Sequence, residues 1–169
     1  ILHLRRKRKR KILALIQRKS KTFYQRSRKM RIAIASDHGG YSFKQIIKEN
    51  LQGTEHAFVD LGTNDSESVD YPDYAEKVVH YVLHNGYDCG ILICGTGIGM
   101  SMVANRHRGI RAALCHGPET ARLSRQHNNA NILCLGARVL PSNDCMPIVR
   151  AFMNTEFEGG RHTARIEKF

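Results

Sequence analysis

Five short apolar runs alternate with helical patterns along most of this 169-residue chain, and that alternation restricts its fold more than any other feature. The apolar runs are typical of β-strands and cover residues 31–35, 56–61, 89–94, 111–115 and 131–135. The helical patterns cover residues 41–51, 74–85, 99–106, 118–126 and 142–154. Strands separated by helices predict a parallel sheet, and the nearly continuous apolar runs ILIC and NILCLG predict helices on both of its faces. We therefore predict an α/β fold with a doubly wound, five-stranded parallel sheet in three α/β/α layers.

The positive charge of the chain is concentrated at its N-terminus. Residues 1–29 contain 13 of the 27 lysines and arginines and no acid, so the rest of the chain, with 14 basic side chains against 15 acidic ones, has a net charge of about −1. We predict a single domain over residues 30–169 and a basic, disordered extension over residues 1–29. A nuclear or RNA-directing segment, a mitochondrial-type presequence and a non-native leader are alternatives for the extension. Its apolar patch is too short to span a bilayer, so we expect no membrane partner.

The five cysteines indicate a reducing environment. They are odd in number, form no CxxC pair and lie mostly in apolar, strand-like runs. We expect an intracellular, cytoplasmic protein without a structural zinc site. His80 and His84 are four residues apart but lack the glutamate of an HExxH motif and a third ligand, so we assign no metal.

Polar and glycine-rich segments follow several of the predicted strands. Ligands of open parallel sheets bind at the carboxyl ends of the strands, so we expect a site assembled there from several loops. Asp37 and His38 follow the first strand and precede two glycines. The carboxylate would orient a substrate hydroxyl, and the imidazole would meet a phosphate or pass a proton. The alternative is an aspartate that caps the loop beside an incidental histidine.

The segment GILICGTGIGMSMVANR, residues 90–106, carries the strongest signal for chemistry. An apolar strand runs into Cys94 and then into a turn that opens a helix, formed by Gly95, Thr96, Gly97, Ile98 and Gly99. Backbone N–H groups in such a turn bind anions and favour the thiolate form of a nearby cysteine, an arrangement that suits enolate chemistry. The turn is neither a Walker A loop nor a GxGxxG fingerprint, so hydride transfer is a minor alternative. Glycines that serve only packing, beside a cysteine that is merely buried, are the other alternative.

His127 and Asn128 end the helical segment ARLSRQHNNAN. A helix that returns between parallel strands ends near their amino edge, opposite the carboxyl-edge loops of the same subunit. If His127 is catalytic, it therefore serves the site of a neighbouring subunit, which predicts a homodimer with shared active sites. The alternative is a polar cluster that caps the helix.

Two further segments carry candidate site residues. Arg161 and Arg165 stand one helical turn apart in a predicted C-terminal arm, where both guanidinium groups would reach one anion. Tyr71, within VDYPDYA, either closes over a sugar or caps a loop.

Together these segments resemble the ribose-5-phosphate isomerase B family, which includes the related galactose-6-phosphate and allose-6-phosphate isomerases. The resemblance covers residues 30–169 and rests on IAIASDHGG, DYPDYA, GILICGTGIGMSMVANR, SRQHNNANILCLGAR and FEGGRHTAR, in this order. It implies a Rossmann-like fold, a dimer with composite active sites, and interconversion of an aldose and a ketose phosphate without a metal or nucleotide cofactor. A tetramer is the alternative assembly.

The resemblance also implies roles for the candidate residues. Cys94 would be the base that moves a proton between C1 and C2, while Thr96 and the backbone amides of residues 95–99 would hold the cis-enediolate. Asp37 and His127 would assist the opening of the furanose ring.

The other candidates would bind the substrate. Tyr71 and Asn128 would orient its hydroxyl groups. The residues implied in phosphate binding are His38, Arg138, Arg161 and Arg165.

The favoured substrates are D-ribose 5-phosphate and D-ribulose 5-phosphate, which the non-oxidative branch of the pentose phosphate pathway interconverts. A hexose-6-phosphate isomerase acting on allose or galactose 6-phosphate is the nearest alternative. A non-catalytic sugar-phosphate-binding module and an RNA-associated protein driven by the basic extension are alternatives from other classes, and neither accounts for Cys94, His127 and the arginines together.

Overall fold

The structure is a computed structural model that describes residues 29–169. Residues 1–28, and with them nearly all of the predicted basic extension, lie outside the described residues. Strands and helices alternate along the described part in the order β1 (Arg31–Ser36), the 3-10 helix η1 (His38–Gly40), α2 (Tyr41–Leu51), β2 (Ala57–Asp60), α3 (Tyr71–His84), β3 (Cys89–Cys94), α4 (Ile98–Ala104), β4 (Ala112–Leu114), α5 (Pro118–Asn128), β5 (Ile132–Gly136), α6 (Ser142–Met153), the 3-10 helix η2 (Gly160–His162) and α7 (Thr163–Ile166).

The five strands form one parallel sheet in the order β2-β1-β3-β5-β4, which confirms the predicted five-stranded parallel sheet. From β1 the chain goes to β2 on one side, and it returns to add β3 on the other side. The switch point of the topology therefore lies between β1 and β3, where ligands of doubly wound sheets bind. Ser36 pairs with Ile93 at the carboxyl end of these strands, so Asp37 and Cys94 leave the sheet side by side.

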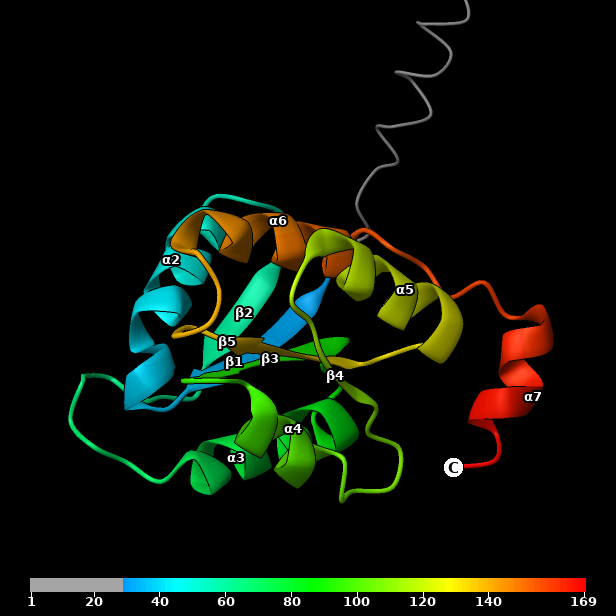
Figure 1. The fold of residues 1–169 in the computed structure, drawn as a ribbon, viewed down its shortest axis with the longest axis horizontal. Helices are drawn as coiled ribbons and strands as arrows, with labels where there is room; N and C mark the ends of the chain where they lie inside the picture. The colour runs from blue at the N-terminus through cyan, green and yellow to red at the C-terminus, as the bar shows by residue number, and fades with distance from the viewer. Residues whose placement is uncertain (1–28) are drawn as a thin grey trace, which may run out of the picture.

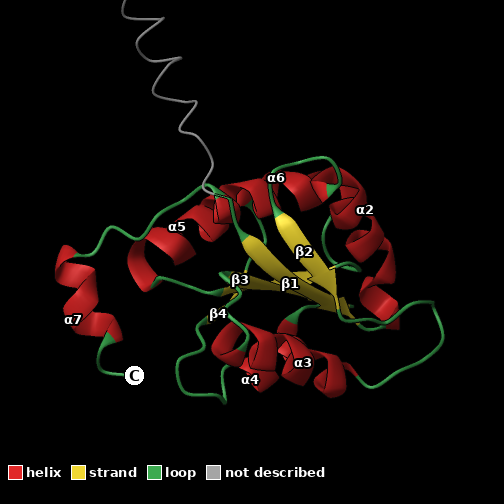
Figure 2. Cartoon of the chain, turned by 180° about the vertical axis from the view of Figure 1, so that it is seen from behind, coloured by secondary structure: helices red, strands yellow, loops and turns green. Residues whose placement is uncertain are grey.

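Helices cover both faces of the sheet, as predicted: α2, α5 and α6 lie over one face, and α3 and α4 lie over the other (Figures 1 and 2). Alternate residues of each strand supply the two cores because side chains alternate between the faces of a strand. Ile32 and Ile34 pack in the cluster that contains Phe152, whereas Ala33 and Ala35 pack in the cluster that contains Met100.

Two helices begin earlier than the sequence predicts. α3 begins at Tyr71 rather than at residue 74, because Pro72 stands in the first turn, where its missing N–H costs no hydrogen bond. α4 begins at Ile98, one residue before the predicted start, and it follows Gly97 in the left-handed conformation.

The chain ends in a short helical arm, η2 and α7, which lies beside the end of α5 (Figure 1). The Glu158 amide donates to the carbonyl oxygen of Gln126 at 3.1 Å and so attaches the arm to this helix. In the described part of the chain, no helix has the length and apolar character needed to cross a membrane.

Candidate active site

Asp37 lies at the end of β1 and is 7% exposed. Its amide donates to the carbonyl oxygen of Ile93 in β3 at 3.1 Å, and its Oδ1 accepts from the Gly40 amide at 3.0 Å. The carboxylate therefore caps η1. A capping role is one of the two interpretations of Asp37 that the sequence allows. The same two bonds fix its position at the switch point of the sheet.

Cys94 is the last residue of β3, and the turn that follows wraps around its sulfur. The Gly97 amide donates to Sγ at 3.1 Å, and the Ile98 amide donates to Thr96 Oγ1 at 3.3 Å. Gly97 has φ 77°, a left-handed conformation that favours glycine. A Cβ at this position would also approach Leu114 Cδ1 to 2.5 Å, so the turn needs glycine here. The backbone thus presents a donor to the thiol.

Arg138 joins the loop after β5 to the Cys94 turn. Its amide donates to the carbonyl oxygen of Gly95 at 2.9 Å. A Cβ placed on Gly39 would lie 3.2 Å from the Gly95 amide nitrogen, 3.3 Å from Asp37 Oδ1 and 3.4 Å from Arg138 Nη2. The structure therefore brings the carboxylate, the glycine turn and the guanidinium group together around Gly39.

Tyr71 and His38 lie at the same edge of the sheet. The Tyr71 ring covers Gly99 so closely that a Cβ there would be 2.7 Å from ring atoms, and 39% of Tyr71 is exposed. His38 Nδ1 accepts from the Val69 amide at 3.2 Å, which ties the loop before α3 to η1. We call the residues at this edge the carboxyl-edge group: Asp37, His38, Tyr71, Cys94, Thr96, Arg138 and the glycines and Ile98 of the turn.

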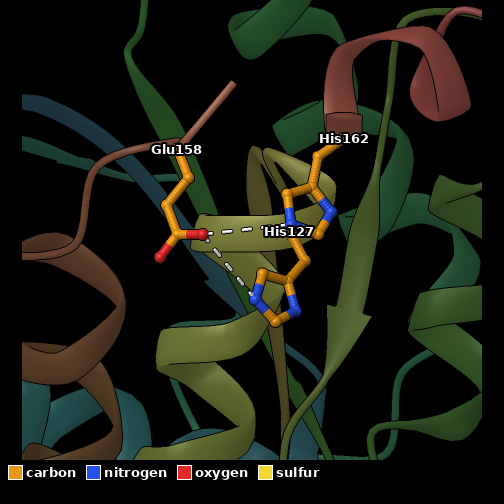
Figure 3. A group of neighbouring side chains, drawn as sticks. All are labelled: His127, Glu158 and His162. Atoms are coloured by element: carbon orange, nitrogen blue, oxygen red, sulfur yellow. Dashed lines mark ion pairs between the residues drawn. The ribbon is translucent and has the colours of Figure 1, made fainter. Parts of the chain in front are cut away.

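His127 lies in a second cluster, which the C-terminal arm completes (Figure 3). Its ring stacks on that of His162 with centroids 4.3 Å apart and planes at 9°. Glu158 Oε2 lies 3.9 Å from Nε2 of each histidine. Arg161 Nε donates to His162 Nε2 at 3.5 Å. Glu158 and His162 were not predicted as site residues, although Glu158 stands three residues before Arg161 and His162 directly follows it.

This second cluster lies at the amino edge of the sheet, as the geometric argument from the sequence predicts. Arg111, directly before β4, donates from Nε to the carbonyl oxygen of Asn129, directly after α5, at 2.8 Å. Figures 1 and 2 both place α7 at the opposite end of the molecule from the start of α2. The predicted site residues on α5 and on the C-terminal arm are His127, Asn128, Arg161 and Arg165, and we call these four the amino-edge group. Within one chain, the candidate residues therefore form two groups at opposite edges of the sheet.

The charges around His162 favour an anion over a cation. Burial lowers the pKa of His162, and the neighbouring His127, Arg161 and Arg165 lower it further, while the single carboxylate of Glu158 works in the opposite direction and is outweighed. His127, Glu158 and His162 are the one set of three potential metal ligands within the described residues, with ligand atoms within 4.8 Å of one another. However, lone pairs of two nearly parallel stacked rings do not converge on one ion, and the Arg161 guanidinium group already donates to His162. The absence of a metal cofactor stays a prediction.

The other cysteines are buried in the two cores, in agreement with their strand-like setting. All five cysteines are free and buried. Burial raises the pKa of Cys89 and of Cys145 to about 12, and it also raises the pKa of Cys115 and Cys134. His80 and His84 are exposed on α3, as expected for residues of a helix surface.

The fold and the site define a class of protein. This is a Rossmann-like α/β protein whose switch point combines a thiol, a carboxylate and an arginine around a glycine turn. The model of the ribose/galactose isomerase family matches residues 32–169, so the chain belongs to this family and is an isomerase.

Its relatives agree with this assignment. The chain is 44% identical over 137 residues to ribose-5-phosphate isomerase B of Escherichia coli, covering 81% of this chain and 92% of that protein. A ribose 5-phosphate isomerase structure from Thermotoga maritima matches with a TM-score of 0.80 and 55% identity, over 82% of this chain and 96% of the other. A Mycoplasma genitalium ribose-5-phosphate isomerase B structure with bound ribulose-5-phosphate matches with a TM-score of 0.78 and 48% identity, over 82% and 92% of the two chains.

Proposed function

We propose that this protein interconverts D-ribose 5-phosphate and D-ribulose 5-phosphate, the aldose–ketose step of the non-oxidative pentose phosphate branch. The observation that carries the proposal is the Cys94 thiol, with the Gly97 amide at its sulfur, beside Asp37 and Arg138 at the switch point. The name of the Escherichia coli relative and the ribulose-5-phosphate bound to the Mycoplasma genitalium relative support a pentose phosphate as substrate.

Cys94 acts as the base in the proposed mechanism. Its thiolate takes the proton from C2 of the open-chain aldose, and the proton is returned to C1 of the cis-enediolate while a proton passes from O2 to O1. The amides of residues 95–99 and the Thr96 hydroxyl stabilise the negative oxygen of the enediolate. Losing one such donor commonly costs about 2.7–4 kcal/mol of transition-state stabilisation in other enzymes.

Ring opening precedes this step. Asp37 and His127 exchange protons with the ring oxygen and the anomeric hydroxyl, and Tyr71 and Asn128 orient the remaining hydroxyl groups.

Four basic side chains bind the phosphate and hold C1 and C2 against the base. They are His38, Arg138, Arg161 and Arg165.

The mechanism requires two copies of the chain. His127 and Arg161 lie at the amino edge, whereas Cys94 lies at the carboxyl edge, so a partner subunit supplies the amino-edge group to each site. We therefore propose a homodimer with two shared sites, with a tetramer built from such dimers as the alternative. The reaction would need neither a metal nor a nucleotide cofactor, and we place the protein in the cytoplasm.

The test is the conversion of D-ribose 5-phosphate to ribulose 5-phosphate by the full chain in the presence of a chelator. We expect Cys94→Ala to abolish turnover and to keep the fold, as judged by far-UV circular dichroism, because only the proposed base is lost. Cys89→Ala, which removes a thiol from the other end of β3, is the matched control and should stay active. Turnover of allose 6-phosphate in preference to the pentose would establish the hexose alternative, and a folded protein inactive on both sugars would indicate a binding module.

A further inference from the structure

Lys44, in the first turn of α2, is fully buried at 0% exposure. Its Nζ donates to Asp60 Oδ1 at 2.6 Å and to the carbonyl oxygen of Thr63 at 2.5 Å. Asp60 ends β2, and Thr63 lies in the loop directly after this strand. A buried ammonium group therefore joins a helix to the carboxyl end of a strand, and the mechanism above does not use it.

The Thr63 loop is bonded in turn to the end of β1. The Thr63 amide donates to the carbonyl oxygen of Ser36 at 2.8 Å, and the Ser36 amide donates to the carbonyl oxygen of Gly62 at 2.7 Å. Ser36 directly precedes Asp37, and the Asp37 carboxylate accepts from Gly40, where α2 is about to begin. Lys44 thus closes a ring that runs from Asp37 through Gly40 and α2 to Lys44, and back through Thr63 and Ser36.

Burial opposes the charged forms of both partners in the ion pair between Lys44 and Asp60. Burial lowers the pKa of Lys44, although Asp60 opposes this effect. Burial also works to raise the pKa of Asp60, but hydrogen bonds from Lys44, Lys48 and the Gly62 amide outweigh it and lower that pKa. Apolar residues of similar volume often stabilise a fold as well as a buried ion pair does. An apolar side chain cannot donate a hydrogen bond to the carbonyl oxygen of Thr63. The contribution that is specific to Lys44 is therefore to fix the position of this carbonyl group.

We propose that Lys44 is a positioning residue of the carboxyl-edge group, which holds the Asp37 carboxylate in place through Thr63 and Ser36. This inference rests on the proposed role of Asp37 in ring opening.

Lys48 provides a matched control. Its Nζ also donates to Asp60, to Oδ2 at 2.6 Å, and its side chain is 24% exposed. Within residues 29–169, this ammonium group donates to no atom of the Thr63 loop. Lys44→Met and Lys48→Met each remove one cation from the Asp60 carboxylate. They differ because only Lys44→Met also removes the hydrogen bond to the Thr63 carbonyl.

We expect Lys44→Met to lower kcat on ribose 5-phosphate by about ten-fold to a hundred-fold with KM changed far less, because a small displacement of a catalytic group is costly. Lys48→Met should keep kcat within about two-fold, as expected of a partly exposed ion pair. Equal kcat in the two variants would overturn the proposal. If Lys44→Met does not fold because Asp60 is left with a buried charge, Lys44→Met and Lys48→Met are each combined with Asp60→Asn and compared in the same assay under the same criterion, since the first pair of changes still removes the donor to Thr63.

Amide hydrogen exchange gives a readout that does not depend on turnover. In Lys44→Met the amides of Thr63 and Gly40 should exchange faster than in Lys48→Met, because Thr63 bonds to Ser36 and Gly40 bonds to the Asp37 carboxylate. Unchanged protection of both amides in Lys44→Met would contradict the positioning role. A wild-type protein inactive on phosphosugars would refute the proposed function, while the exchange measurement would still decide whether Lys44 holds Asp37.

Discussion

At the residue scale, Cys94 differs from the other four cysteines in what surrounds its sulfur. The Gly97 amide donates to the sulfur of Cys94. Burial raises the pKa of the other four thiols. Thiols react as thiolates, so a cysteine whose pKa is raised to about 12, as that of Cys89 is, reacts slowly at neutral pH.

We therefore expect iodoacetamide at neutral pH to alkylate Cys94 at least about ten-fold faster than any other cysteine of the folded protein. Turnover should fall in step with this labelling, and ribose 5-phosphate should slow both. Peptide mass mapping during inactivation measures the order of labelling. Labelling of Cys89 or Cys134 ahead of Cys94, or full turnover after Cys94 is labelled, would contradict the assignment of the base.

Some site residues could be predicted from the sequence, and others could not. Asp37 and Cys94 directly follow apolar strands, and the carboxyl ends of parallel strands meet at one edge, so their proximity follows from the fold class. Lys44 gives no such signal, because its burial depends on Asp60 and Thr63, 16 and 19 residues further along the chain. In the sequence it is an ordinary lysine of an amphipathic helix.

At the scale of elements, periodicity predicted which segments become strands and helices but not how they pair. β5 lies between β3 and β4, although β4 precedes it in the chain. Apolar runs that are buried on both faces look alike, so nothing local in the sequence determines this order. The start of α3 was predicted too late for a different reason: the Tyr-Pro pair at its first turn looks like a loop.

The arm formed by η2 and α7 should dock less firmly in acid. His162 is buried beside His127, Arg161, Arg165 and Glu158, and its pKa is lowered in the folded state because burial and the three basic neighbours outweigh the carboxylate of Glu158. The undocked arm binds a proton more readily, so docking is at full strength above the ordinary histidine pKa of about 6.5 and weakens as the pH falls below it.

Amide hydrogen exchange of the arm, corrected for intrinsic rates, measures this effect between pH 7.5 and pH 5.5. We expect protection of residues 160–166 to fall on acidification while protection of β3 does not change. The variant His162→Gln should lose most of this pH dependence because it lacks the titrating ring. Equal protection at both pH values in the wild-type protein would show that His162 does not couple docking to protonation.

At the scale of the whole molecule, the candidate site is divided between two edges of one sheet. The direction of α5 was enough to predict this division, since a helix between parallel strands ends at their amino edge. The contacts that hold the amino-edge group together were not predictable, because the stack of His127 on His162 joins a helix to an arm 35 residues further along the chain.

The most direct test of the whole account is complementation between two inactive variants. Cys94→Ala lacks the carboxyl-edge base, and His127→Ala lacks the amino-edge histidine, so each homodimer should show little or no turnover of ribose 5-phosphate. After subunit exchange in an equal mixture, half of the dimers are mixed, and each mixed dimer has one intact site, which predicts about a quarter of the wild-type activity. Native mass spectrometry confirms that mixed dimers form. If each site were built from one chain alone, every site of a mixed dimer would contain either Cys94→Ala or His127→Ala and would stay inactive. Mixed dimers without recovered activity would therefore contradict the sharing of sites between subunits.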